Sequence, residues 1–218
     1  MILLTRKKCR PKFPDSYIGD KAEEYDSLNW MERNQEKSTM TAIEYLYDEN
    51  LGADIQIGKP SLILDLGCGT GYSSQVLLEN GFRVIGIDVL RDMLSKAQKK
   101  KNSFQNRNNL DLVLADINYL PIKSNSIDHI ISISAYNFIT YNRKDLRDKI
   151  KTINNTAKYL HKILKNTNGR IIIEFYPENE QELDLFVSSF KRNGFDGFKV
   201  MNKESQKSGQ TYLLLRKR

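Results

Sequence analysis

Short apolar runs alternate along the chain with segments whose apolar residues recur every three to four positions. The runs have the length of strands, whereas the longer spacing is that of one buried helix face. The pattern predicts strands at 62–66, 83–87, 110–115, 129–134, 170–176, 198–202 and 211–216. It predicts helices at 38–49, 72–79, 91–101 and 143–165, and a further helix from an N-cap at Asn179 to Gly194.

Strands and helices that alternate in this way form a parallel sheet covered on both faces. The polar loop 203–210 joins the last two predicted strands, which therefore close the sheet as an antiparallel hairpin. Right-handed crossovers place a ligand crevice at the carboxyl ends of the early strands. The predicted fold class is α/β, with the functional site at that edge of the sheet.

The composition fits one globular domain. The chain has 218 residues, 39% of them hydrophobic and 28% charged, with no break in composition. We expect a single domain over 1–218, with a basic, irregular arm at 1–24, helices at 25–60 and a catalytic sheet domain at 61–218. No apolar run has the length of a membrane span, and the first charges come too early for a secretory signal. A cytoplasmic location is expected, or a nuclear one in a eukaryote.

The chain carries an excess of positive charge, because 34 Lys and Arg against 27 Asp and Glu give a net charge of +7. Basic residues gather before Asp15, near the end of the helix at 91–101 and in the last three residues. Such an excess attracts polyanions such as RNA. Solvated lysine-rich faces explain it equally well.

Metal chemistry is not predicted. Cys9 and Cys68 are the only cysteines, and His129 and His161 are the only histidines. Neither pair has the spacing of a zinc site.

A glycine-rich turn follows the first predicted strand in LILDLGCGTGY. Gly67, Gly69 and Gly71 permit positive φ and a close approach of a ligand to the backbone. A dinucleotide fingerprint places its third glycine one residue later and has no counterpart of Asp65. An acid two residues before the first glycine favours a ligand with an ammonium group, although Asp65 has the alternative role of ordering its own loop.

Two further acids follow the next two strands. Asp88 ends the segment VIGID, where an acid accepts hydrogen bonds from ribose hydroxyls. Asp116 follows LVLA, where it accepts from an adenine amino group, with Ile117 against the ring, or serves simply as a turn residue. An amino-acid head, a ribose and an adenine occur together in S-adenosylmethionine, which is the predicted cofactor.

This ordered set of motifs resembles the class I S-adenosylmethionine-dependent methyltransferases. The resemblance implies a Rossmann-like, mostly parallel seven-stranded sheet in the order 3-2-1-4-5-7-6, and release of S-adenosylhomocysteine as product. The predicted cofactor-binding residues of the sheet domain are Asp65, Gly67, Cys68, Gly69, Gly71, Asp88, Val89, Met93, Asp116, Ile117 and Ser134.

The segment ISISAYNFI follows the fourth strand, at the edge where an acceptor would bind. It contains no carboxylate and no histidine, so it favours an acceptor whose lone pair needs no base, such as N7 of guanine. Tyr136 and Phe138 are candidates for stacking on a flipped-out base, and Asn137 for hydrogen bonding to its edge. Ser134 and Tyr176 complete the predicted acceptor pocket, in which no residue is assigned as catalytic. A core role in the following helix is the alternative for Phe138.

Longer runs carry a closer resemblance. They include AEEYDSLNWMERNQEKSTMTAIEYL, GIDVLRDML, LPIKSNSIDHIISISAYNFI and the segment 173–215, which begins IEFYPEN. Over about residues 22–216 they resemble the small-subunit rRNA guanine-N7 methyltransferases known from eukaryotic ribosome assembly. The resemblance implies methylation of a guanine in small-subunit rRNA, and it implies that Tyr25 and Gln35 close over the cofactor.

The same resemblance implies a partner, the small zinc-binding activator protein that several methyltransferases share. This activator pairs with an edge of the sheet, which in the implied strand order is the apolar strand 110–115. We therefore expect a heterodimer and poor solubility of the chain alone. Asn137 and Phe138 stand where the family has Gln-Trp, and the chain stops at Arg218 without a basic extension, which favours an archaeal-type or minimal member.

Two other functions remain open. A small-molecule methyltransferase would share every cofactor motif, but it would have an apolar acceptor cavity and no need of a basic arm. A non-catalytic assembly factor would keep the fold as a scaffold for pre-ribosomal RNA. The predicted function is N7 methylation of a guanine in small-subunit rRNA, for which RNA binding should weaken steeply with salt.

Overall fold

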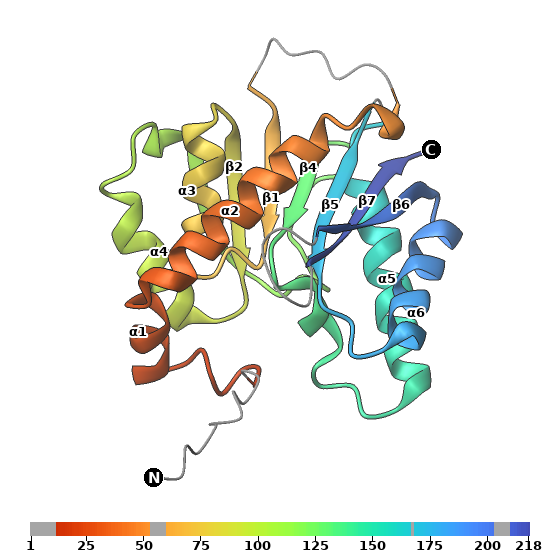
Figure 1. Cartoon of the computed structure of the whole chain (residues 1–218), viewed down its shortest axis with the longest axis horizontal. Coiled ribbons are helices and arrows are strands. Elements are labelled where there is room, and N and C mark those ends of the chain that lie inside the picture. The colour runs from red at the N-terminus through yellow and green to blue at the C-terminus, as the bar shows by residue number, and fades with distance from the viewer. Residues whose placement is uncertain (1–11, 53–59, 167, 203–209) are drawn as a thin grey trace, which may run out of the picture.

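The computed structural model describes residues 12–52, 60–166, 168–202 and 210–218. A seven-stranded sheet forms its centre, with helices on both faces (Figure 1). The strands are β1 Leu62–Leu66, β2 Arg83–Asp88, β3 Leu110–Leu114, β4 His129–Ser132, β5 Arg170–Phe175, β6 Phe195–Asn202 and β7 Gln210–Lys217. The helices are α1 Asp20–Asp26, α2 Asn29–Leu46, α3 Tyr72–Glu79, α4 Arg91–Lys101, α5 Leu146–Ile163 and α6 Glu180–Arg192, with short 3-10 turns η1 Glu49–Leu51, η2 Arg107–Asn109 and η3 Tyr136–Thr140.

The strand order is β3-β2-β1-β4-β5-β7-β6, which confirms the order expected from the class I methyltransferases. β1 pairs in parallel with both β2 and β4, and β7 pairs antiparallel with β5 and β6. The chain therefore runs outward from β1 to β3 and then returns to place β4 on the other side of β1. A crevice at the carboxyl ends of β1 and β4 follows from this reversal.

Two apolar clusters hold the layers together, one on each face of the sheet. One cluster joins α2 and α3 to the sheet, and the other joins α5 and α6. Figure 1 shows α2 crossing the near face of the sheet. All residues of β4 and β5 are buried, which explains why these strands are almost continuously apolar in sequence.

The structure corrects the sequence-based elements at the N-terminal side. Helix α2 begins at Asn29 rather than at 38, because residues 29–37 form a largely polar helical extension without an apolar period. Residues 20–24, expected to belong to an irregular arm, lie in helix α1, whose acidic first turn suits a helix N-terminus. Arm residues 1–11, with Cys9, and loop residues 203–209 lie outside the described residues.

Candidate cofactor and acceptor site

The turn after β1 packs directly against the segment that follows β4. Gly67 has a φ of 74°, and a Cβ built on it would lie only 2.2 Å from the Cβ of Ala135. A side chain at this position would therefore clash as well as strain the backbone. The amides of Gly67 and Cys68 donate to the carbonyl of Ile87 at 2.8 and 2.9 Å, so the turn is fixed against β2 as well.

The Asp88 carboxylate fixes the glycine turn to the end of β2. Its Oδ2 accepts a hydrogen bond from the Gly69 amide at 2.9 Å, and its Oδ1 accepts from the Leu90 amide at 2.7 Å. Burial raises the pKa of Asp88, and the amide donors oppose that rise. Each carboxylate oxygen has a second lone pair, so Asp88 retains the capacity to accept from ligand hydroxyls.

A cavity of about 450 Å³, its open mouth included, lies at the carboxyl ends of the first four strands. The lining residues come from the turns after β1, β2, β3 and β4 and from the N-terminal segment: Gly67, Asp88, Val89, Asp116, Ile117, Asn118, Ala135, Phe138, Ile139, Tyr141 and Phe13. The structure thus brings together Gly67, Asp88, Val89, Asp116 and Ile117 of the predicted cofactor set.

Asp116 combines the two roles that the sequence left open. Its Oδ1 accepts from the backbone and side-chain amides of Asn118 at 2.8 and 3.0 Å, which makes it a turn residue. It also lines the cavity beside Ile117.

Asp65 does not line the cavity, so its predicted contact with the ammonium group of the cofactor stays a prediction. Its side chain is fully buried, and Oδ2 accepts from the hydroxyls of Ser73 and Ser74, both at 2.7 Å. Oδ1 has no hydrogen-bond partner within the described ranges, and burial raises the pKa of Asp65 to about 6. The carboxylate orders its own loop and the first turn of α3. Cys68 and Met93 are likewise buried beneath the turn and do not line the cavity.

Tyr136 is part of the core, and the prediction that it stacks on a base is wrong. Its side chain is fully buried, with ring centres 5.7 Å from those of Phe186 and Phe190 in α6. The turn η3 points this side chain inward, because the position begins a tight turn rather than extending β4. Its hydroxyl has no hydrogen-bond partner among the described residues.

We call residues 133–141, which follow β4, the lip. Some of its other residues support neighbouring segments, and others line the cavity. The side-chain amide of Asn137 donates to the carbonyl of Tyr176 and accepts from its amide at 3.3 Å, so it joins the lip to the segment after β5. Phe138 lines the cavity and stacks on Phe13, with ring centres 4.7 Å apart and planes 17° apart. Of the predicted acceptor residues, Phe138 therefore presents its ring to the cavity, whereas Asn137 supports the lip.

Glu174, on β5, is a further polar residue at this edge that the sequence analysis missed. Its side chain is fully buried and accepts hydrogen bonds from Ser38, Ser134, Tyr176 and Gln210. Ser134 consequently faces Glu174 and does not line the cavity. The signal in the sequence was an acid within the apolar run IIIEF, since a carboxylate is rarely buried unless it has partners.

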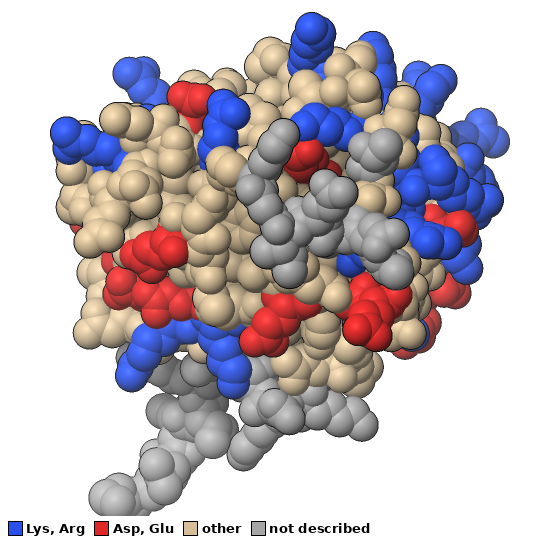
Figure 2. All heavy atoms as spheres, turned by 90° about the horizontal axis from the view of Figure 1, so that it is seen from above, with Lys and Arg blue, Asp and Glu red and all other residues tan. Residues whose placement is uncertain are grey.

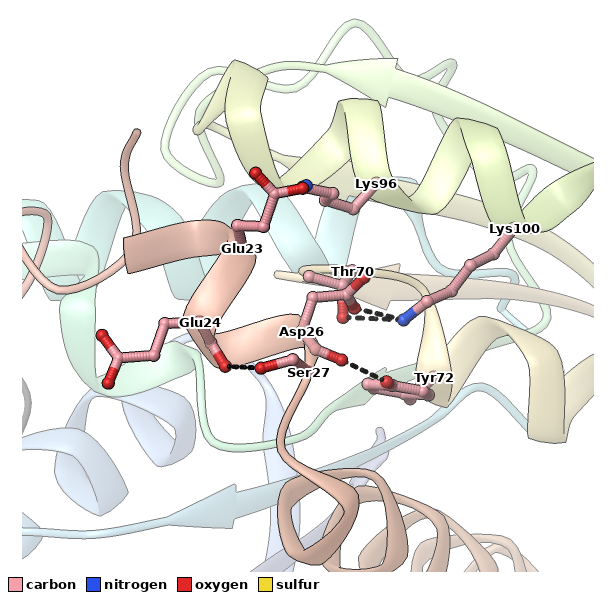
Figure 3. Close-up of polar contacts among 8 residues, drawn as sticks. All are labelled: Glu23, Glu24, Asp26, Ser27, Thr70, Tyr72, Lys96 and Lys100. Carbon is pink, nitrogen blue, oxygen red and sulfur yellow. Dashed lines mark hydrogen bonds and ion pairs between the residues drawn. The ribbon is translucent and has the colours of Figure 1, made fainter. Parts of the chain in front are cut away.

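Helix α1 is held over the glycine turn by polar contacts to α3 and α4 (Figure 3). Lys96 forms an ion pair with Glu23 at 2.6 Å, and Lys100 forms an ion pair with Asp26. The Tyr72 hydroxyl donates to the carbonyl of Asp26 at 3.0 Å, and Lys100 Nζ lies 3.4 Å from the centre of the Tyr72 ring. These contacts fasten the N-terminal segment beside the cavity.

Tyr25 and Gln35, the residues expected to close over the cofactor, lie together. Their side chains share a hydrogen bond, and burial raises the pKa of Tyr25. The Tyr25 ring also meets that of Tyr17 edge-on, with centres 5.3 Å apart. Neither Tyr25 nor Gln35 lines the cavity, so their role toward the cofactor stays a prediction.

In the described parts of the chain, no group of three His, Cys, Asp or Glu is placed to hold a metal ion. Nor does any helix in those parts combine the length and apolar character needed to cross a membrane. Burial lowers the pKa of His129 to about 4, which keeps this side chain neutral near pH 7.

Comparison with known proteins agrees with this architecture. A family model described as a methyltransferase domain matches residues 63–159. The 18S rRNA (guanine-N(7))-methyltransferase of Bos taurus is 30% identical over 201 residues, which cover 91% of this chain and 66% of that protein. The chain thus spans about two thirds of the length of this relative.

Two solved structures share the fold. Magnesium protoporphyrin IX methyltransferase (ChlM) from Synechocystis PCC 6803 with bound SAM has a TM-score of 0.66 and 19% identity, covering 94% of both chains. A complex between the Haloferax volcanii Trm112 methyltransferase activator and a methyltransferase gives a TM-score of 0.60 and 16% identity, covering 92% of this chain and 98% of the matched chain.

Proposed function

We propose, for a chain that belongs to the class I S-adenosylmethionine-dependent methyltransferases, N7 methylation of a guanine in small-subunit rRNA. One observation carries the proposal: a single cavity joins the cofactor-type residues after β1, β2 and β3 to an aromatic side chain after β4. Similarity to an 18S rRNA (guanine-N(7))-methyltransferase supports the choice of acceptor.

The cavity residues fit the cofactor. The backbone at Gly67, where a Cβ has no room, leaves an approach for the methionine part. Asp88 would accept hydrogen bonds from the ribose, and Asp116 with Ile117 would hold the adenine. When bound, S-adenosylmethionine supplies a methyl group activated on a sulfonium.

The acceptor side of the cavity suits a base that needs no deprotonation. The N7 lone pair of guanine forms the new N–C bond, the electron pair of the broken C–S bond stays on sulfur, and the positive charge passes to the purine. No proton is removed, and residues 135–141 accordingly contain no acid and no histidine. Glu174 is fully buried, so it is not exposed to act as a base. Phe138 offers a flat apolar face on which a base would stack.

The test is mass spectrometry of small-subunit rRNA nucleosides from cells with and without this gene. We expect loss of one 7-methylguanosine in the deletion, restored by the wild type but not by Asp88→Ala. Asp184→Ala, which removes an exposed acid of α6, is the matched control and should restore it. Unchanged 7-methylguanosine in the deletion strain would refute the rRNA assignment, and unchanged cofactor affinity of Asp88→Ala in calorimetry would refute the ribose role.

The proposal includes a small zinc-binding activator protein that adds to the edge of the sheet at β3. β3 is a terminal strand of the sheet, and its Leu114 side chain is 54% exposed. An open apolar edge of this kind is a template for strand addition by another chain. The structural relative from Haloferax volcanii in complex with an activator supports this partner.

Edge substitutions test the partner. Leu114→Arg on β3 should reduce co-purification of the co-expressed activator, whereas Met201→Arg on the opposite edge strand β6 should not. Met201 is a close control because its side chain is 57% exposed. Equal recovery of the activator with both variants would exclude β3 as the docking edge.

An RNA acceptor is consistent with the net charge of +7. On the face shown in Figure 2, however, Lys and Arg side chains are interspersed with Asp and Glu, so that face does not present an uninterrupted basic surface. RNA binding should still weaken steeply as salt rises from about 50 to 200 mM. Binding that is insensitive to salt would favour a small-molecule acceptor.

A further inference from the structure

The buried carboxylate of Glu174 joins three segments that are distant from it in sequence, and it also bonds the nearby Tyr176. Its Oε1 accepts from Ser38 Oγ of α2 at 2.8 Å, from Gln210 Nε2 of β7 at 2.6 Å and from Tyr176 Oη at 2.8 Å. Its Oε2 accepts from Ser134 Oγ of the lip at 2.5 Å. An ionised carboxylate can accept all four of these hydrogen bonds, because the three hydroxyls and the amide are each able to donate.

Within the described part of the chain, no cationic side chain is paired with this carboxylate. All four donors are neutral side chains, and no ion pair within the described ranges includes Glu174. A buried charge without a counter-ion is costly, and an amide of the same shape would also join these segments. The negative charge itself therefore calls for an explanation.

The position of Glu174 behind the cavity suggests why a negative charge would be kept there. Its partner Ser134 has a φ of 56°, a strained conformation for a residue other than glycine. The next residue, Ala135, lines the cavity and is the residue in contact with the Gly67 turn. The carboxylate thus lies directly behind the lip, with one residue between its partner and the cofactor turn.

We propose that Glu174 is a specificity-determining residue that makes the site favour the cationic sulfonium cofactor over its neutral thioether product. S-adenosylmethionine carries one more positive charge than S-adenosylhomocysteine, so a fixed negative charge behind the lip stabilises the first selectively. After methyl transfer that stabilisation is lost from the bound product, which favours its exchange for fresh cofactor. The inference rests on the proposed cofactor and is independent of the identity of the acceptor.

Calorimetric titration of the full chain with each of the two molecules tests the inference. Glu174→Gln keeps the shape and removes the charge, and it should raise the ratio of the two dissociation constants, S-adenosylmethionine over S-adenosylhomocysteine, about tenfold. This is the order expected for unit charges on the order of 10 Å apart in an effective dielectric of about 20. Glu174→Asp keeps the charge and should leave the ratio near that of the wild type, even if both affinities fall.

A second pair of variants applies if Glu174→Gln does not fold. Gln210→Lys places a cation against the intact carboxylate and should raise the ratio in the same direction. Gln210→Met removes the same hydrogen bond without adding charge, so it should leave the ratio unchanged.

The outcomes distinguish a failure of the charge role of Glu174 from a failure of the proposed cofactor. Parallel weakening of both affinities, or an unchanged ratio in Glu174→Gln, would overturn the charge role while leaving the enzyme assignment intact. Failure of the wild type to bind either molecule would instead refute the proposed cofactor. A ratio that rises equally in Gln210→Lys and Gln210→Met would show that packing, not charge, sets the preference.

Discussion

Asp65 and Glu174 are two fully buried carboxylates on the same face of the sheet, yet their surroundings differ. Asp65 near the end of β1 accepts two hydrogen bonds on one oxygen and leaves Oδ1 without a partner. Glu174 near the end of β5 accepts on both oxygens from four donors. Equal burial therefore does not imply equal electrostatic cost.

The sequence separation of their partners explains the difference. The partners of Asp65 are eight and nine residues away, within one strand–turn–helix unit. Those of Glu174 are 136, 40, 36 and 2 residues away, so they meet only when α2, the lip and β7 have all docked. Asp65 is a local support of the glycine turn, whereas Glu174 joins the lip after β4 to the rest of the fold.

The largest expected effect is on stability when each carboxylate is removed. Glu174→Ala leaves four donors without this acceptor, two of them in the buried residues Ser38 and Gln210, and should lower the free energy of unfolding by roughly 4 kcal/mol. Asp65→Ala loses two hydrogen bonds but also removes an incompletely satisfied charge, so it should cost about 2 kcal/mol or less. Urea denaturation near pH 7.5 measures both. A loss for Asp65→Ala as large as that for Glu174→Ala would contradict the comparison.

The pH dependence of stability isolates Asp65. Its pKa in the folded chain is raised from 3.8 to about 6 by burial, so the folded state holds its proton more tightly than the unfolded state. The resulting destabilisation is absent below about pH 4, grows as pH rises and is complete above about pH 6. This difference in pKa between the folded and the unfolded chain corresponds to a loss of about 3 kcal/mol in the free energy of unfolding.

The matched measurement uses Asp65→Asn. The difference between its free energy of unfolding and that of the wild type should grow by about 3 kcal/mol from about pH 4 to pH 7, in favour of the variant. Asp184→Asn, at an exposed position, should follow the wild type throughout. A flat difference between Asp65→Asn and the wild type would show that Asp65 ionises normally in the folded chain.

The same contrast between local and distant contacts separates what the sequence predicted from what it did not. The strands and helices α3 and α4 follow from the apolar periodicity and from the motifs between strands, which are local signals, whereas the strand order was implied by the resemblance to the class I methyltransferases. Whether Asp65 faces a ligand or its own loop depends on side-chain direction, which the motif does not specify. Tyr136 was placed in the pocket because an aromatic residue suits both a base and a core, and only packing against α6 decides.

Helix α1 and the Glu174 cluster were missed for the same reason. α1 is a short polar helix that is held in place by contacts with α4. The four donors of Glu174 are unremarkable Ser, Tyr and Gln residues until the fold assembles them.

Tyr136→Phe extends the comparison to a neutral buried group. In the part of the chain that the structure describes, the buried Tyr136 hydroxyl has no hydrogen-bond partner, like Oδ1 of Asp65, but it bears no charge. Its removal should leave the ring packing in place and raise the free energy of unfolding by about 1 kcal/mol. Tyr212→Phe is the control, because the Tyr212 hydroxyl is close to the Ser38 carbonyl at 3.5 Å, and it should give no gain. A loss of stability in Tyr136→Phe would reveal a partner for that hydroxyl.

The two ion pairs of α1 provide the smallest expected effects, because they join distant segments as Glu174 does but lie nearer the surface. The Asp26–Lys100 pair spans 74 residues, and its two side chains are 19% and 23% exposed. Lys100→Met keeps much of the apolar stem and should lower the free energy of unfolding by about 1 kcal/mol or less, with an increase in hydrogen exchange confined to α1. Lys96→Met breaks a pair in which Glu23 is 75% exposed and should cost less still. If salt at about 1 M abolished the effect of Lys96→Met but not that of Lys100→Met, burial rather than sequence separation would be the property that sets the strength of these links.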